Sequence, residues 1–158
     1  ECRYVEKDSE SPNSLENILK SKQIPINFDI LSIDIDSFDL EIWESLKNYS
    51  PKIVIIEINS GYLPGIIKWH TGKIGNNYGG NSFSATLMVA NNKGYQLICH
   101  TGNMIFIKKE YLDNINLNEK YIIYPELLFN DSSVMSSLKV NPLIKLKNFL
   151  KKIIKRTQ

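Results

Sequence analysis

The sequence predicts an α/β fold in which a mostly parallel sheet ends in an antiparallel hairpin. Residues 28–35 and 52–58 are short, almost continuous runs of apolar residues, a pattern typical of strands that are buried on both faces. Residues 40–48 lie between them and repeat apolar side chains at helical spacing. Two more apolar runs, 95–99 and 104–108, flank a short turn and therefore predict the hairpin.

The N-terminal residues 1–27 are predicted to form a loop followed by one short helix. Asn13 or Ser14 can cap this helix, because either side chain can accept a hydrogen bond from a free backbone N–H at a helix start. Apolar residues from Leu15 onward recur at helical spacing, and the pattern ends near residues 21–25. We therefore expect the first strand to begin close to residue 28.

Two further helices have recognisable boundaries. The helix over 40–48 stops before Pro51, because a proline disfavours helical backbone at the residue that precedes it. A later helix begins at Ser82 or Ser84 and ends at Gly94, since glycine readily adopts the left-handed conformation that closes a helix. The hairpin follows this helix directly.

A glycine-rich segment over residues 61–81 separates the second strand from the later helix. A loop of this length inside a compact domain is uncommon unless it binds or covers a ligand, so we interpret it as a substrate loop. Trp69 and Tyr78 are its candidate substrate-binding residues, through stacking on a sugar. The alternative for these rings is an apolar cluster beneath the loop. His70 is a candidate catalytic residue that accepts a proton.

The pattern weakens beyond residue 110. Residues 143–156 indicate a basic helix with one apolar side. Such a helix fits either peripheral contact with an anionic membrane or packing on the domain through its apolar side. The expected organisation is an N-terminal loop and helix over 1–27, an α/β core over 28–110 and a C-terminal extension over 111–158.

Composition excludes several classes of protein. A chain of 158 residues fits one domain, and its net charge of +2 is too small to indicate a nucleic-acid partner. Cys2 and Cys99 show no metal-ligand spacing, and no apolar run reaches the roughly 18 residues of a membrane span. A signal-peptide pattern is also absent, so we expect a cytoplasmic protein, with 143–156 as its candidate contact with the inner membrane surface. The first residue is Glu1 instead of Met, which we interpret as a piece of a longer protein.

Three stretches carry a more specific signal: SIDIDSFDLEIWESL, PKIVIIEINSGY and GGNSFSATLMVANNKGYQLICHTGNMIFIKK. Together they resemble the FkbM-type group of S-adenosylmethionine-dependent methyltransferases, over roughly residues 28–109. The positions that match are Asp34, Asp36, Asp39, Trp43, Glu57, Asn59, Ser82, Gly94, Tyr95, Gly102 and Asn103. Ser37 and Phe38 depart from the pattern, because they replace a Gly-Asn pair.

The resemblance implies the second half of a Rossmann-like methyltransferase fold, a three-layer sandwich whose last strand inserts antiparallel. It also implies S-adenosylmethionine as cofactor and methylation of a hydroxyl group on a small molecule such as a sugar. The glycine-rich turn that would bind the cofactor has no counterpart between Glu1 and Phe28. We therefore expect that this chain alone does not bind S-adenosylmethionine.

Polar residues follow both predicted strands at their carboxyl ends, where ligands bind in open α/β sheets. Neighbouring parallel strands lie about 4.8 Å apart, so the side chains of Asp34 and Glu57 are expected to converge. With Asn59 they form a candidate ligand set for Mg²⁺, and Glu57 and Asn59 are also candidate substrate contacts. Asp34 or Asp36 is, like His70, a candidate general base. Alternatively, Asp34 or Asp36 caps the following helix while Glu57 pairs with a surface lysine.

Two other functions remain open. The tripeptide Asp34-Ile35-Asp36 is a DxD sequence of the kind that binds a metal in nucleotide-sugar glycosyltransferases. A noncatalytic interaction module is the third possibility. In each case the first strand would lie at a sheet edge, so we expect a homodimer or contact with residues outside this chain.

Overall fold

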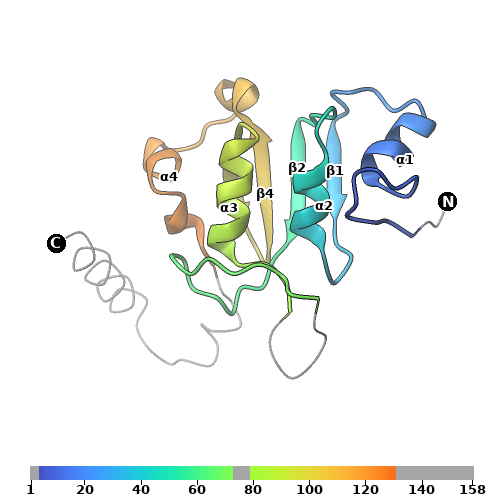
Figure 1. The fold of residues 1–158 in the computed structure, drawn as a ribbon. Helices are drawn as coiled ribbons and strands as arrows, with labels where there is room; N and C mark the ends of the chain where they lie inside the picture. The colour runs from blue at the N-terminus through green and yellow to red at the C-terminus, as the bar shows by residue number, and fades with distance from the viewer. Residues whose placement is uncertain (1–3, 73–78, 131–158) are drawn as a thin grey trace.

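The structure, a computed structural model, describes residues 4–72 and 79–130. Its centre is a four-stranded sheet with the strand order β1-β2-β4-β3 (Figure 1). The strands are β1 (Ile30–Ile33), β2 (Ile53–Glu57), β3 (Tyr95–His100) and β4 (Asn103–Lys108). β1 and β2 are parallel, whereas β4 runs antiparallel to both β2 and β3. The sheet is therefore mixed instead of mostly parallel, because the hairpin strand β4 forms two antiparallel pairs.

Helices α2 and α3 lie side by side on one face of the sheet (Figure 1). The helical elements are α1 (Leu15–Ser21), α2 (Asp39–Ser45), α3 (Phe83–Asn92), α4 (Glu119–Ile123) and the 3₁₀ turns η1 (Lys109–Asn114) and η2 (Pro125–Leu128). α4 and η2 contact β3, which is the edge strand opposite β1. The described part of the chain thus has an α/β architecture.

The hydrophobic core lies between the sheet and the pair α2 and α3. Val54 and Phe106 face each other across β2 and β4, and both are fully buried. The Trp43 ring of α2 lies 5.4 Å from the Phe106 ring and 5.5 Å from the Tyr95 ring, measured between centroids. Tyr95 also donates its hydroxyl proton to the Pro51 carbonyl. The aromatic contacts therefore join α2, β3 and β4.

Most predicted elements form close to their expected positions. Ser14 caps α1 by accepting a hydrogen bond from Asn17 N–H, and Gly94 has a φ of +80° after α3. The hairpin of β3 and β4 is confirmed, with a register shift between Leu97 and Cys99. β1 is shorter than the predicted strand over 28–35, because the chain turns away from β2 after Ile33.

Several predictions concern residues that the structure does not describe. Tyr78 and the basic segment 143–156 lie outside the described residues. The described parts of the loop over 61–81 contain neither helix nor strand, as the sequence predicts. β1 lies at a sheet edge, and pairing of this edge in a homodimer stays a prediction. Nowhere in 4–72 or 79–130 is there a helix of the length and apolar character that crossing a membrane requires.

Candidate functional site

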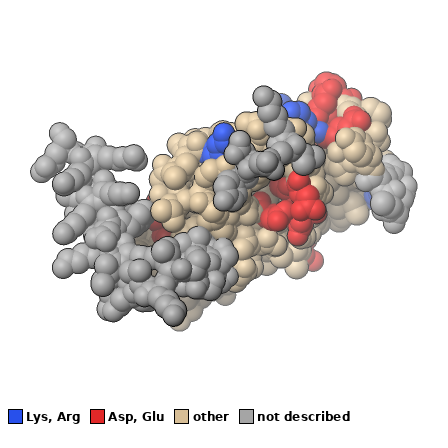
Figure 2. Space-filling model, turned by 90° about the horizontal axis from the view of Figure 1, so that it is seen from below, with Lys and Arg blue, Asp and Glu red and all other residues tan. Residues whose placement is uncertain are grey.

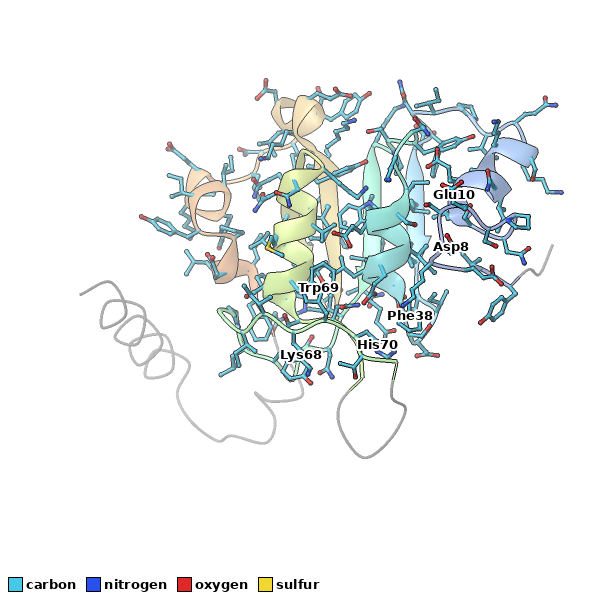
Figure 3. All side chains as sticks on the ribbon, in the orientation of Figure 1. Asp8, Glu10, Phe38, Lys68, Trp69 and His70 are labelled. Carbon is cyan, nitrogen blue, oxygen red and sulfur yellow. The ribbon has the colours of Figure 1, made fainter. Side chains whose placement is uncertain are left out.

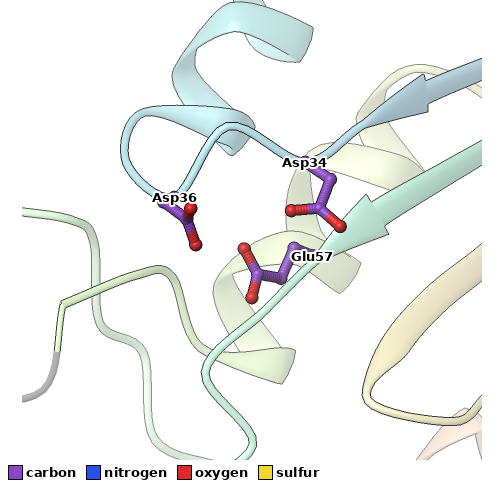
Figure 4. A group of neighbouring side chains, drawn as sticks. All are labelled: Asp34, Asp36 and Glu57. Carbon is purple, nitrogen blue, oxygen red and sulfur yellow. The ribbon is translucent and has the colours of Figure 1, made fainter.

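Three carboxylates meet where the parallel strands β1 and β2 end (Figure 4). Ile33 of β1 pairs with Ile56 of β2, so Asp34, which follows β1, and Glu57, the last residue of β2, lie side by side. Asp36 joins them from the turn that leads to α2. One oxygen of each carboxylate lies within 4.8 Å of the others. The predicted convergence of Asp34 and Glu57 is therefore present, and we call the three residues Asp34, Asp36 and Glu57 the acidic cluster.

A fourth acid, Asp39, organises the turn that carries Asp36. Its carboxylate accepts hydrogen bonds from the backbone N–H groups of Ile35, at 2.8 Å, and Ser37, at 3.0 Å. Asp39 is only 4% exposed, whereas Asp34 and Asp36 are exposed. Asp36 has a φ of 58°, a left-handed conformation that aspartate tolerates better than most residues. These contacts hold the turn in the shape that directs Asp36 toward Glu57.

The alternative structural roles of the acidic residues are not found. The N-cap residue of α2 is Phe38, and no side chain caps this helix by a hydrogen bond. The prediction that Asp34 or Asp36 caps α2 is therefore wrong. Among the described residues, Glu57 forms no ion pair with a lysine, whereas Lys52 pairs with Asp29 at the other end of β1.

Glu57 lies in an electrostatically unfavourable position. Burial raises the pKa of its carboxyl group, and the nearby charges of Asp34, Asp39 and Asp36 raise it further. A hydrogen bond between the Glu57 and Asp34 carboxyl groups also favours the protonated form. Figure 2, which views the molecule from below, shows acidic side chains gathered on this face. Negative charge is thus concentrated at this end of the sheet.

The acidic cluster borders a cavity of about 450 Å³. Two of its carboxylates, those of Asp36 and Glu57, belong to the cavity wall. The loop after β2 and the residues before α3 form the rest of the wall. The lining residues are Asp36, Ser37, Asp39, Glu57, Ile58, Asn59, Ser60, Gly61, Gly79, Gly80 and Asn81. The cavity therefore offers carboxylate, hydroxyl and amide groups to a polar small molecule.

Asn59 lines the cavity, but its amide group holds the loop together. Its Nδ2 donates to the Gly79 carbonyl at 2.6 Å, and its Oδ1 accepts from Gly61 N–H at 2.9 Å. Gly80 lies so close that an added Cβ would be 3.3 Å from the Asn59 Cβ. Asp36 joins Asp34 and Glu57 in the acidic cluster, and the prediction that Asn59 is a metal ligand stays a prediction.

His70 lies near Phe38 and fastens the loop (Figure 3). It does not line the cavity. Its Nδ1 accepts a hydrogen bond from Gly80 N–H at 3.0 Å, and its ring packs edge-on against Phe38. A neutral histidine with an accepting Nδ1 carries its proton on Nε2, so this ring offers a donor instead of a base. Trp69 is half-buried and packs against the hydrophobic core, which fits the apolar-cluster alternative.

The pair Ser60 and His100 was missed by the sequence analysis. The structure makes His100 the last residue of β3, 3% exposed, with its ring stacked on Phe129. Its Nδ1 accepts from Asn130 N–H at 2.9 Å, and its Nε2 lies 3.1 Å from Ser60 Oγ. The accepting Nδ1 makes Nε2–H the donor to Ser60, so His100 orients this cavity hydroxyl instead of deprotonating it. Strand alternation alone would not have indicated its burial, because the register shift between Leu97 and Cys99 changes which side chains face the core.

A second cavity, of about 480 Å³, lies on the other side of Ser37. The N-terminal residues Tyr4 to Asp8 form one wall, and apolar side chains of the β1–α2 region form the other. Lys7 Nζ lies 4.1 Å from the centroid of the Phe38 ring, a cation–π contact that fastens the N-terminal segment. The turn that carries Asp36 thus stands between two cavities.

Comparisons with known proteins add no homologue. The chain matches no family model, no curated protein and no solved structure. The methyltransferase resemblance is therefore supported by the sequence motifs alone, and the chemistry of the site has to be argued from its own residues.

Proposed function

We propose that this chain provides the acceptor-binding side of an S-adenosylmethionine-dependent O-methyltransferase that acts on a hydroxyl group, with a sugar as the favoured substrate class. The observation that carries the proposal is the acidic cluster beside a polar cavity at the carboxyl ends of β1 and β2. Open α/β sheets bind small molecules at this edge. The resemblance to FkbM-type methyltransferases supports the reaction type, and it implies a third layer on the open face of the sheet.

The acidic cluster fits a hard divalent cation. One oxygen of each carboxylate lies within 4.8 Å of the others, whereas three oxygens bound at about 2.4 Å to one ion can be at most about 4.2 Å apart. Mg²⁺, with bonds of about 2.1 Å, requires the carboxylates to close by roughly 1 Å or to bind through water. Asp34, Asp36 and Glu57 would hold the ion, and a substrate hydroxyl bound to it would lose its proton more easily.

The carboxylates can also act without a metal. The pKa of the Glu57 carboxyl group is raised toward neutral pH. A general base is most effective when its pKa lies near the working pH. Ser60, oriented by His100, can donate a hydrogen bond to a second oxygen of the substrate. A diol or a sugar offers neighbouring oxygens for both contacts.

S-adenosylmethionine supplies an activated methyl group, so the protein residues mainly have to position the acceptor. The turn between β1 and α2, residues 34–38, contains no glycine, and none of the described strands runs through a tight glycine-rich turn directly into a helix. The described residues therefore fit the acceptor side of the reaction and do not fit the cofactor.

The test is calorimetry of the chain with a panel of sugars and nucleotide sugars, with and without Mg²⁺, because the described residues fit the acceptor and do not fit the cofactor. We expect an acceptor to bind, and Asp34→Asn to weaken its binding about tenfold, the scale of one lost hydrogen bond to a charged group. Asp29→Asn is the matched control, because Asp29 is an exposed acid at the other end of the same strand, paired with Lys52. Acceptor binding that is equal in both variants would contradict the assignment of the site.

A glycosyltransferase is the second candidate, because both acids of Asp34-Ile35-Asp36 belong to the acidic cluster. A metal-binding DxD sequence needs this convergence. Calorimetry with a UDP-sugar and Mn²⁺ separates the two reactions. Binding that requires both Mn²⁺ and the UDP group, and that Asp36→Asn abolishes, would favour the glycosyltransferase. No binding of a sugar or of a UDP-sugar would favour an interaction module.

A further inference from the structure

One face of the sheet is closed, and the opposite face is partly open. Val54 and Ile56 of β2 point toward α2 and α3 and are fully buried. Ile53 and Ile55 alternate with them, point to the opposite face and are only half-buried. On the neighbouring edge strand β1, Ile30 is 56% exposed. The face opposite α2 and α3 therefore leaves apolar surface accessible.

The strand register makes this surface continuous. Ile30, Ile53 and Ile107 form one row across β1, β2 and β4, and Ser32, Ile55 and Ile105 form the next. We call these six residues the isoleucine face. Ser32 is exposed and Ile105 is half-buried, whereas Ile107 is buried, so the accessible part of the face lies mainly over β1 and β2. A contiguous apolar sheet surface of this kind is normally covered by a further layer of the fold or by a partner.

We propose that residues 143–156 of the same chain dock on the isoleucine face through their apolar side and form a third layer of the domain. This segment lies outside the described residues. Three of its properties favour docking: the length of chain that connects it to Asn130, its apolar pattern and its positive charge.

The reach is sufficient. The described chain ends at Asn130, whose backbone N–H donates to His100 Nδ1 at the end of β3. Residues 131–142 follow, and twelve extended residues span up to about 40 Å. The three strand spacings from β3 to β1 add up to only about 14 Å. Residue 143 can therefore reach any part of the isoleucine face.

The apolar pattern matches a sheet surface. Leu143, Leu146, Leu150 and Ile153 recur at intervals of three and four residues, which places them on one side of a helix. A helix over 143–156 would be about 21 Å long, enough to cross β1, β2 and β4. Branched aliphatic side chains on both surfaces can interdigitate, and they need no polar partner.

Charge favours the same position. Asp34 follows Ser32 by two residues, and Glu57 follows Ile55 by two. Both acids therefore project from the same face as the isoleucines, at the carboxyl ends of β1 and β2. The segment 143–156 carries six basic residues, Lys145, Lys147, Lys151, Lys152, Lys155 and Arg156. Docking therefore brings positive charge toward a group of carboxylates that lacks a lysine partner among the described residues.

Cysteine labelling of the full chain tests the proposal. Ser32→Cys, in a background with Cys2→Ser and Cys99→Ala, places a single thiol on the isoleucine face. The thiol is labelled with a maleimide before and after the triple substitution Leu146→Ser, Leu150→Ser and Ile153→Ser. If the segment is docked in about nine molecules of ten, the triple substitution should speed labelling about tenfold.

Two controls isolate the apolar contact. Glu44→Cys places the thiol on the exposed side of α2, so its labelling rate should not change with the triple substitution. Replacing Lys151, Lys152 and Lys155 by serine should change the Ser32→Cys rate much less than the apolar substitutions do. Circular dichroism of each variant verifies that the sheet is retained.

Two results would overturn the proposal. Equal labelling of Ser32→Cys with and without the triple substitution would show that the segment does not cover the face. Protection that disappears on dilution, together with a dimer in sedimentation velocity, would identify a second copy of the chain as the occupant.

Discussion

Replacing Glu57 by glutamine should increase the free energy of unfolding of the metal-free protein at neutral pH. The Glu57 carboxylate faces Asp34 and Asp36, with one oxygen of each residue within 4.8 Å of the others. Glutamine keeps the size and the hydrogen-bonding capacity of the side chain and removes its charge. The substitution therefore removes repulsion while it leaves the packing of β2 unchanged.

The size of the effect follows from Coulomb's law. Two unit charges at 4.8 Å repel each other by about 0.9 kcal/mol in water. Physiological salt, with a Debye length of about 8 Å, reduces this value to roughly half. Glu57 faces two such charges, so we expect a gain of about 1 kcal/mol at neutral pH.

The sign of the pH dependence is fixed by the shifted pKa of Glu57. Burial and the neighbouring carboxylates raise this pKa in the folded state, so the folded protein binds the proton more tightly than the unfolded chain does. The stabilisation that protonated Glu57 gives to the folded state is complete below the ordinary glutamate pKa. It is lost as the pH rises through the raised pKa of the folded state. Glutamine does not titrate. The gain should therefore be absent near pH 3 and develop fully by about pH 7.

Urea unfolding at several pH values, with EDTA present, measures the effect. Glu44→Gln is the control, because Glu44 is an exposed acid of α2 whose charge favours the protonated form of Lys93. Its replacement should give no gain at neutral pH. The reasoning is refuted if Glu57→Gln is less stable than the native chain at pH 7, or if its gain is the same at pH 3.

Four further substitutions or conditions have definite expectations. Millimolar Mg²⁺ should raise the melting temperature of the native chain more than that of Glu57→Gln, which thermal scans compare directly. Asp39→Asn should cost about 1–3 kcal/mol in urea unfolding, because a neutral amide oxygen replaces a buried carboxylate with two N–H partners. Ser14→Ala should cost about 1 kcal/mol through loss of the α1 cap. Tyr95→Phe should cost about 1–3 kcal/mol, since the buried Pro51 carbonyl loses its donor.

The strands were predictable because their signals are local. Residues 53–57 form an unbroken β-branched run that ends in a carboxylate, and the hairpin places Thr101 and Gly102 between two apolar runs. The meeting of Asp34 with Glu57 followed from one additional rule, that parallel neighbours end at the same edge. The prediction that the last strand inserts antiparallel came from the family resemblance. The local sequence pattern of the hairpin is the same whether β3 or β4 lies next to β2.

The loops could not be predicted at the level of individual side chains. Nothing in the sequence distinguishes Asp39 from Asp36 until the turn is built, and it is Asp39 that becomes buried and accepts the two backbone N–H groups. Asn59 looked like a ligand because it follows a strand, yet the fold uses both ends of its amide within the loop. Such roles depend on contacts between residues about 20 positions apart, which periodicity does not encode.

The acidic cluster and the isoleucine face are parts of one surface. Side chains alternate along β2, so Glu57 projects from the same face as Ile53 and Ile55, two and four residues before it. Whatever covers the isoleucines must therefore border the carboxylates. A basic segment in that position would lower the repulsion around Glu57 and would also narrow access to the site from that side. The occupant of the isoleucine face therefore influences the charge around the acidic cluster. The cysteine-labelling experiment and the Glu57→Gln unfolding experiment have to be interpreted together.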